Sequence, residues 1–155
     1  MHAAEIHGRV RATSAQDVFE TIADFDRYQD YGGSIRSVRV ESTQGNVVTS
    51  KWDVDFRGGR MQWTEEDTID RDRLRIDFQQ IEGSLRHFAG HWTVSADGED
   101  ALVHFFGEFD LGMPSLASFI ERIAESAIRE NLTAVLRGMF GDRFQLEPSA
   151  ASASA

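Results

Sequence analysis

The chain has 155 residues and a mass of 17.4 kDa, with 41% hydrophobic and 27% charged residues, which is the composition of one globular domain. Its net charge of −10 argues against a nucleic-acid partner, because binding to phosphate groups depends on concentrated Lys and Arg. The absence of cysteine excludes disulfides and thiolate metal sites, and no apolar run approaches the roughly 18 residues of a membrane span. No secretion signal is visible at the N-terminus, so a cytoplasmic location is the default expectation.

An N-terminal strand followed by two short helices is expected first. Residues 3–13 alternate between apolar and polar side chains, which indicates a half-buried strand. Thr13 or Ser14 can cap a helix that runs through residues 14–24. The stretch FDRYQDYGG at 25–33 predicts a second short helix or a turn, ended by its glycine pair.

A period of two then dominates the sequence, and short turn signals such as QGN, RGG and ADGED interrupt it. This pattern predicts an antiparallel meander of six further strands. These strands are expected at residues 35–42, 46–57, 60–70, 73–81, 86–96 and 100–111.

The last predicted element is a long helix from Pro114 to about Phe140, which would be on the order of 38 Å long. A seven-stranded sheet must cover its apolar face, and this helix is the one predicted element long enough to do so. The sequence therefore predicts a single α+β domain over residues 1–145. The small, polar residues 146–155 are expected to form a disordered tail.

Three stretches of this pattern resemble the helix-grip superfamily, also called SRPBCC, which includes START domains and polyketide cyclases. They are VFETIADFDRYQDY, RMQWTEED and RIDFQQIEGSLRHFAGHWTV, and the likeness covers about residues 3–143. Within the superfamily, the chain is most similar to the polyketide cyclase/dehydrase and coenzyme Q-binding protein branch. The resemblance implies a curved sheet that wraps the long helix and leaves a ligand cavity between them.

Aromatic and polar side chains share the inward face of the predicted strands. All three tryptophans, Trp52, Trp63 and Trp92, point to this face. An ordinary packed core would explain the tryptophans alone, but ionised carboxylates such as Glu65 and Asp67 are rarely buried without a partner or a purpose. A cavity with aromatic walls and a few polar groups fits this face better. Its predicted substrate-binding residues are Tyr31, Ser50, Trp52, Met61, Trp63, Phe78, Gln80, Phe88, Trp92 and Asn131.

Glu65 and Asp67 are the predicted acid–base pair. At positions i and i+2 of a strand, their side chains start roughly 7 Å apart on the same face. Desolvation beside Trp63 and mutual repulsion would both raise their pKa values, so that one of them could hold a proton near neutral pH. Such a pair suits proton transfers on a carbonyl substrate. An alternative is that Asp67 simply meets water or an arginine at a frayed strand end.

Two tyrosines and an asparagine are further candidates, which the resemblance places near the cavity. Tyr28 is predicted as a catalytic acid, and Tyr31 as a hydrogen-bond donor at the rim, although both could merely cap the core. Asn131 occupies a position that this branch points into its pocket, or else lies on the solvated face of the helix. No metal site is predicted, because His87 and His91 on one strand are about 13 Å apart.

The preferred functional prediction is a cofactor-independent polyketide cyclase, aromatase or dehydratase of natural-product biosynthesis, acting on a polyketide-like or polycyclic apolar substrate. The resemblance makes an acyl carrier protein a candidate partner, although two acidic proteins repel each other. The alternative is a carrier that binds a quinone, lipid or natural product without catalysis. A weaker third possibility is an interaction module whose cavity is filled by its own side chains.

Overall fold

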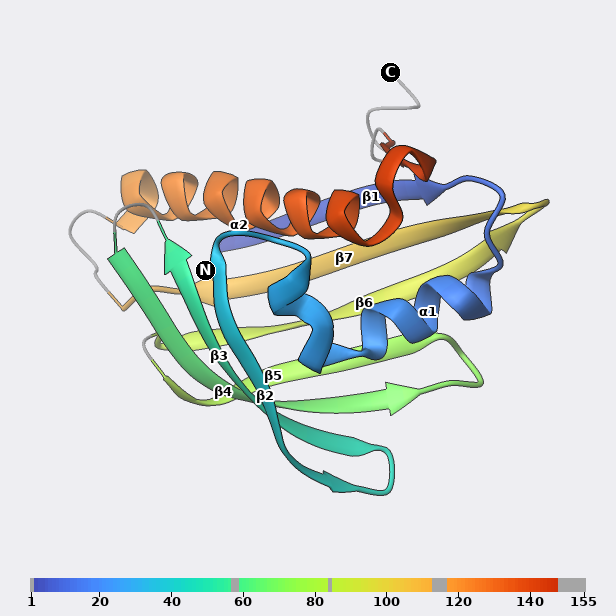
Figure 1. Ribbon diagram of the computed structural model, residues 1–155. Coiled ribbons are helices and arrows are strands. Elements are labelled where there is room, and N and C mark those ends of the chain that lie inside the picture. Colours follow the sequence, from blue (N-terminus) through green and yellow to red (C-terminus); the bar gives the residue numbers. More distant parts are fainter. Residues whose placement is uncertain (1, 57–58, 84, 113–116, 148–155) are drawn as a thin grey trace.

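The computed structural model describes residues 2–56, 59–83, 85–112 and 117–147, and its elements follow the predicted order. Figure 1 shows a curved sheet with one long helix lying across it. In chain order the elements are β1 (His2–Val10), α1 (Ala15–Ala23), the 3₁₀ helix η1 (Phe25–Asp30), β2 (Ile35–Gln44), β3 (Val47–Phe56), β4 (Gly59–Asp70), β5 (Arg75–Gly83), β6 (His87–Asp97), β7 (Asp100–Asp110), α2 (Ala117–Phe140), the 3₁₀ helix η2 (Gly141–Arg143) and β8 (Phe144–Leu146).

The strands form one antiparallel sheet in the order β2-β3-β4-β5-β6-β7-β1-β8. The predicted α+β helix-grip fold is confirmed, but the sheet has eight strands instead of the expected seven. The extra strand, β8, pairs with residues 8–10 of β1, and the ring of Phe144 lies over Gly8. The sequence pattern does not reveal β8, because three residues are too few to display a period of two.

The start of the expected tail belongs to this sheet. Leu146 is the last residue of β8, and the Glu147 amide donates to the His7 carbonyl at 2.8 Å. Arg9 holds the same region by donating to the carboxylates of Glu147, Asp97 and Asp100 at 2.6, 2.8 and 3.0 Å. The rest of the expected tail, residues 148–155, lies outside the described residues.

The two short helices close one end of the sheet. Ser14 is the N-cap of α1, and its Oγ accepts from the Asp17 amide at 3.1 Å. The expected second short helix or turn is the 3₁₀ helix η1, which contacts β2. Together α1 and η1 place Phe19, Ile22 and Tyr28 in the core, where each side chain is almost completely buried.

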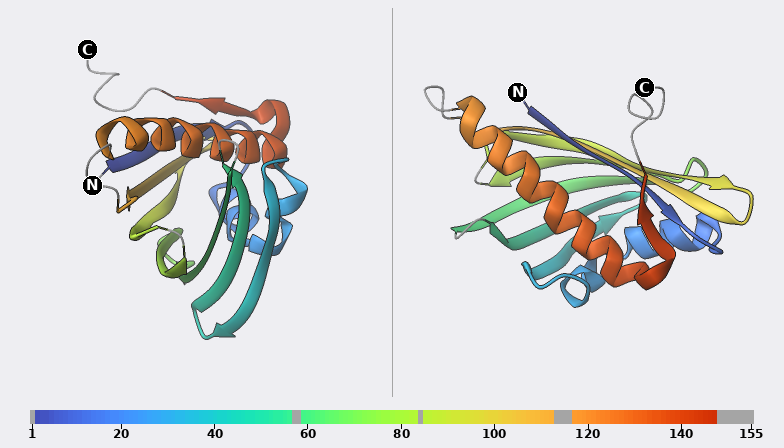
Figure 2. Two further views of the ribbon diagram at one scale, coloured as in Figure 1. Left: turned by 90° about the vertical axis from the view of Figure 1, so that its left-hand side faces the viewer. Right: turned by 90° about the horizontal axis from the view of Figure 1, so that it is seen from above.

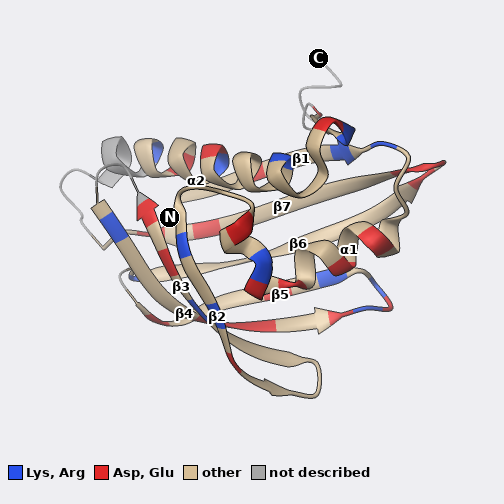
Figure 3. Ribbon diagram, viewed as in Figure 1, with Lys and Arg blue, Asp and Glu red and all other residues tan. Residues whose placement is uncertain are grey.

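Helix α2 covers the concave face of the sheet, as the views in Figure 2 show. It has 24 residues, so it is about 36 Å long. Its inward stripe includes Ala124, Ile128, Val135 and Leu136, all buried. Acidic and basic residues are interspersed along the rest of this helix (Figure 3). The expected start at Pro114 lies outside the described residues.

No helix in the described ranges combines the length and the apolar character needed to cross a bilayer.

Two facing glycines let the sheet bend where β6 and β7 pair. Gly90 lies opposite Gly107, and both belong to the inward-facing set of their strands. A Cβ at Gly90 would overlap the Phe106 carbonyl oxygen, and a Cβ at Gly107 would lie 2.8 Å from the ring of Phe105. The absence of both side chains therefore allows a close backbone approach and leaves room for an aromatic ring of the core.

Gly90→Ala is expected to lower the free energy of unfolding by about 1–3 kcal/mol, because the added methyl forces the two strands apart. Urea denaturation of both proteins measures this difference. Gly33→Ala is the matched control, since no atom lies within 4 Å of its added Cβ. Equal midpoints for the wild type and the Gly90 variant would show that the sheet adapts without cost.

Candidate functional site

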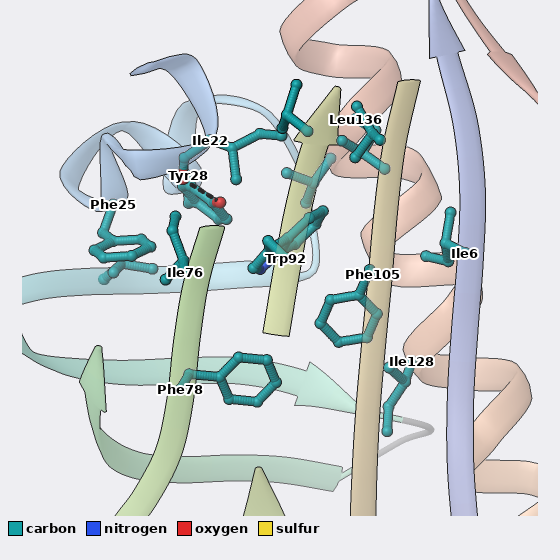
Figure 4. Packing of buried hydrophobic residues seen from close by; sticks show 14 of the residues in the cluster. Ile6, Ile22, Phe25, Tyr28, Ile76, Phe78, Trp92, Phe105, Ile128 and Leu136 are labelled. Carbon is teal, nitrogen blue, oxygen red and sulfur yellow. Dashed lines mark hydrogen bonds between the residues drawn. The ribbon is translucent and has the colours of Figure 1, made fainter. Parts of the chain in front are cut away.

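A cavity lies between the concave face of the sheet, helix α2 and the 3₁₀ helix η1. The cavity has a volume of about 90 Å³, counted as the positions that the centre of a water molecule can take. One water molecule needs roughly 10–15 Å³ by the same measure, so the cavity has room for several. Figure 4 shows side chains from β5, β6, β7 and α2 converging on this region. The lining residues are Phe25, Tyr28, Ile35, Trp52, Val54, Met61, Trp63, Glu65, Phe78, Leu85, Phe88, Trp92, Phe105, Ile128, Asn131, Leu132 and Val135.

Most of the predicted site residues line this cavity, and four do not. The residues placed at its wall are Tyr28, Trp52, Met61, Trp63, Glu65, Phe78, Phe88, Trp92 and Asn131. The remaining four, Tyr31, Ser50, Asp67 and Gln80, are absent from the lining. The alternation along the strands therefore predicts which side chains point to the inner face of the sheet. It does not predict which of these side chains reach the cavity wall.

The indole rings of Trp52 and Trp63 form a parallel stack that serves as one wall of the cavity. The register of β3 and β4 pairs the two residues directly, and their rings stack with centroids 5.7 Å apart and planes at 3°. Tyr28 meets Trp52 edge-on at 5.2 Å and 89°, and Phe88 meets Trp63 at 5.8 Å and 79°. This side of the cavity is therefore built from aromatic rings, which suits a ligand that contains rings itself.

Two buried carboxyl groups lie at and behind this wall. The exposed fraction of Glu65 is 6% and that of Asp67 is 0%. Trp63 Nε1 donates to Glu65 Oε1 at 2.8 Å. Behind the wall, Ser50 Oγ donates to Asp67 Oδ2 at 2.7 Å, and Trp52 Nε1 donates to the same Ser50 oxygen at 2.9 Å. Glu65 therefore faces the cavity, while Asp67 and Ser50 form a supporting layer.

The direction of these hydrogen bonds is fixed, because an indole N–H can only donate. Ser50 Oγ accepts from Trp52, so its own proton points to Asp67 Oδ2. Glu65 Oε1 likewise accepts from Trp63. The two oxygens left for a proton are Glu65 Oε2 and Asp67 Oδ1, and the latter is buried without a hydrogen-bond partner in the described part of the chain.

The environment raises the pKa of both carboxyl groups. Burial is the main cause for Glu65, whose pKa lies well above its ordinary value, and the nearby Asp67 carboxylate raises it further. Burial also raises the pKa of Asp67, while the proximity of the Glu65 carboxyl and the hydrogen bond from Ser50 act in the opposite direction. The pair consequently holds on to a proton at a higher pH than either group would alone in water.

Three of the other predicted polar residues have structural partners. The Tyr28 hydroxyl donates to the Ile22 carbonyl at 2.6 Å (Figure 4), and burial raises the pKa of this phenol well above its usual range. Gln80 Nε2 donates to the Leu85 carbonyl at 2.6 Å and so fixes the segment between β5 and β6. Tyr31 packs at the edge of the core. The Tyr28 hydroxyl therefore already donates its proton to the backbone, and its oxygen can still accept a hydrogen bond.

Eight lining residues were not among the predicted site residues. Two of them, Val54 and Phe105, lie on β3 and β7, and the other six lie outside the central strands. Phe25 comes from η1, Ile35 begins β2, and Leu85 lies between β5 and β6. The other three, Ile128, Leu132 and Val135, come from α2. Their helical spacing signals an inward stripe, but it does not distinguish a residue that packs against the sheet from one that faces a space.

The cavity wall offers one ionisable carboxyl and one amide among apolar groups. Within the described part of the chain, its lining contains no Lys, Arg or His. An anionic ligand would thus find no cation inside, and it would meet the Glu65 and Asp67 pair. The arrangement can exchange one proton with a bound molecule at Glu65, and Asn131 can donate or accept a hydrogen bond.

Comparison with known proteins agrees with the fold. The sequence model of the family described as "Polyketide cyclase / dehydrase and lipid transport" matches residues 12–136. No curated protein sequence matches the chain.

Solved structures with the same architecture come from several bacteria. TTHA0849 from Thermus thermophilus is 21% identical, with 92% of this chain and 96% of that chain covered and a TM-score of 0.82. The Zhui aromatase/cyclase from Streptomyces sp. R1128 is 21% identical, with 92% and 94% covered and a TM-score of 0.78. A START superfamily protein from Mycobacterium smegmatis is 14% identical, with 90% and 97% covered and a TM-score of 0.78. At these identities the likeness shows a shared fold.

The raised pKa of Glu65 makes the folded chain less stable at high pH. Above about pH 4.5, its ordinary value, the folded state holds a proton that the unfolded state has released. Stability therefore falls as the pH rises towards the folded pKa, by about 1.4 kcal/mol for each unit by which the pKa is raised. Glu65→Gln keeps an oxygen for Trp63 and cannot ionise, so we expect its stability relative to the wild type to increase between pH 5 and pH 9.

Urea denaturation across this pH range measures the difference, with Glu66→Gln on the opposite strand face as the control. Parallel stability curves for the wild type and Glu65→Gln would show that Glu65 is ionised in the folded protein.

Proposed function

The chain belongs to the polyketide cyclase/dehydrase and lipid transport family, and from this premise we propose that it binds a neutral, ring-containing apolar molecule and catalyses a proton-transfer reaction on it. The observation that carries the proposal is the position of Glu65. It is the one carboxyl group among the described lining residues, it touches the stacked Trp52–Trp63 wall, and a second carboxyl lies directly behind it. The reaction class is cyclisation or dehydration of a polyketide-like substrate.

A single proton shared by Glu65 and Asp67 supports this chemistry. When Glu65 carries the proton, it is an acid that can donate to a carbonyl or hydroxyl oxygen of the ligand. When Asp67 carries it, Glu65 is a carboxylate that can accept a proton from carbon. Asp67 does not line the cavity, so its role in the proposal is to position Glu65 and exchange a proton with it.

Dehydration of a β-hydroxy ketone shows how the proton balance closes. Glu65 as the carboxylate removes a proton from the carbon beside the ketone, and that electron pair becomes the new carbon–carbon double bond. The carbon–oxygen bond of the hydroxyl breaks, and the leaving oxygen takes the proton back from Glu65 to depart as water. No net proton is consumed, and the aromatic wall of the cavity holds the substrate in place for both transfers.

The comparisons support the ligand class and leave the reaction to experiment. The family description names both cyclase/dehydrase activity and lipid transport. Zhui is named an aromatase/cyclase, and a di-domain aromatase/cyclase from the steffimycin biosynthetic pathway also shares the fold, with a TM-score of 0.69. A substrate presented by an acyl carrier protein remains part of the proposal.

A carrier without catalysis is the second candidate, and a specific observation favours it. The Tyr28 hydroxyl donates to a backbone carbonyl, and the indole N–H groups of Trp52 and Trp63 are occupied within the protein. The cavity thus offers few free donors to stabilise a developing negative charge. In a carrier, the carboxyl network would serve to fix the wall on which the ligand lies.

A neutral ligand is expected to bind better than an anionic one, because the lining described above has no cation. Anthraquinone and anthraquinone-2-carboxylate are matched probes, and quenching of tryptophan fluorescence reports their binding. We expect the carboxylate to bind at least about tenfold more weakly at pH 7.5, because burying an unpaired charge is costly. Trp63→Ala should weaken both probes, since it removes half of the stacked wall. Preferential binding of the carboxylate would contradict the proposal.

Catalysis can be separated from binding with the protein's own ligand. Native mass spectrometry of the protein purified from its producer identifies a co-purifying molecule, which is then incubated with fresh protein. An enzyme should yield an isomer or a product lighter by one water. Glu65→Gln should then lower kcat by about 10²-fold or more and leave binding within a few-fold, because it removes the transferable proton and keeps the shape.

Asp67→Asn and Glu66→Gln complete the set. The first should shift the pH profile of kcat, since Asp67 acts through Glu65, and the second should behave like the wild type. A ligand that binds all variants equally and is recovered unchanged would establish the carrier instead.

A further inference from the structure

Glu5, His7 and His104 form a cluster on the opposite face of the sheet from the cavity. Glu5 and His7 lie on β1, and His104 lies on β7, directly across from His7 in the register. The neighbouring residues Ile6 and Phe105 point inward and are buried, which places the cluster on the convex face. The side chains of His7 and His104 are 29% and 30% exposed, so the cluster is open to solvent.

The three side chains lie close together. His104 Nε2 lies 2.7 Å from Glu5 Oε2, and His7 Nε2 lies 3.6 Å from the same oxygen. The two imidazole rings stack with centroids 4.5 Å apart and planes at 18°. One potential ligand atom from each residue lies within 4.8 Å of the other two.

These separations are close to those around a tetrahedral metal ion. Ligand atoms about 2.1 Å from such an ion lie roughly 3.4 Å from one another. The Glu5–His7 separation of 3.6 Å already has this size, and the Glu5–His104 separation of 2.7 Å must open by well under an ångström. Glu5 is 48% exposed, so its flexible side chain can make that adjustment without disturbing the core. The stacked imidazole rings must also turn, because a bound ion lies in the plane of each ring that holds it, and both side chains are partly exposed.

We propose that Glu5, His7 and His104 bind a divalent transition-metal ion such as Zn²⁺ on the convex face of the sheet. Two imidazole nitrogens and one carboxylate oxygen are a donor set that suits Zn²⁺, and three protein ligands leave one position open to solvent. The net charge of −10 also favours the approach of a cation. The bound ion would join β1 to β7, beside the pairing of β1 with β8.

The site is independent of the proposed reaction, because none of its residues lines the cavity. His104 also meets His91 of β6 edge-on, with ring centroids 5.6 Å apart. Because His91 lies beside His104 but is not one of the three proposed ligands, His91→Ala is a useful additional variant. It should change Zn²⁺ affinity much less than removal of a ligand.

Isothermal titration with Zn²⁺ tests the proposal on untagged, full-length protein freed of metal by a chelator. We expect saturable binding of one ion, and we expect His104→Ala and His7→Ala each to weaken it by more than about tenfold. Loss of a hydrogen-bond partner to a ligand already costs about 10–100-fold in metal affinity, so loss of a ligand should cost no less. Binding should also raise the Tm of the wild type and leave that of His104→Ala unchanged.

His87→Ala is the matched control, because His87 lies on the same face, contacts Glu108 and is outside the cluster. Circular dichroism confirms that each variant is folded, and the imidazole NMR signals of His7 and His104 should shift on addition of Zn²⁺. The proposal is overturned if Zn²⁺ gives no saturable binding, or if affinity is the same in the wild type, His7→Ala and His104→Ala.

Discussion

The register between β3 and β4 is the constraint on which the cavity wall depends. It places Ser50 opposite Glu65, Trp52 opposite Trp63 and Val48 opposite Asp67. A shift of one residue would turn one strand's inward set to the convex face, separate the two indoles and take the Ser50 donor away from Asp67. The stacked wall, the supporting layer and the raised pKa values are therefore consequences of one pairing.

This arrangement lowers the stability of the folded state. Two carboxyl groups on one strand are buried beside aromatic rings, and one of their oxygens, Asp67 Oδ1, has no hydrogen-bond partner among the described residues. A core built for stability alone would place apolar side chains at these positions. Buried carboxyl pairs of this kind reduce the stability of a fold, and they are common at functional sites.

Periodicity was enough to predict the order of helices and strands and the inward face of each strand, because these are properties of single segments of the chain. The curved sheet around the long helix came from the resemblance to a known family. Trp52, Trp63, Trp92 and Glu65, which periodicity places on the inward face, line the cavity. Periodicity could not show that Ser50 and Asp67 lie behind the wall or that Gln80 binds the backbone of Leu85, since these outcomes depend on side-chain directions between strands. Strand β8 was too short to carry a pattern. His7 and His104 are far apart in sequence, and only their pairing across β1 and β7 brings them together.

The hydrogen bonds of the two stacked tryptophans give the site its own optical reporters. Trp63 Nε1 donates directly to Glu65, and Trp52 Nε1 reaches Asp67 through the Ser50 hydroxyl. A change of charge on either carboxyl group alters the electric field along a different indole, and an indole's emission depends on that field. The chain thus carries a natural fluorophore beside each carboxyl of the pair, so a change in the charge of the pair can be followed in the unlabelled protein.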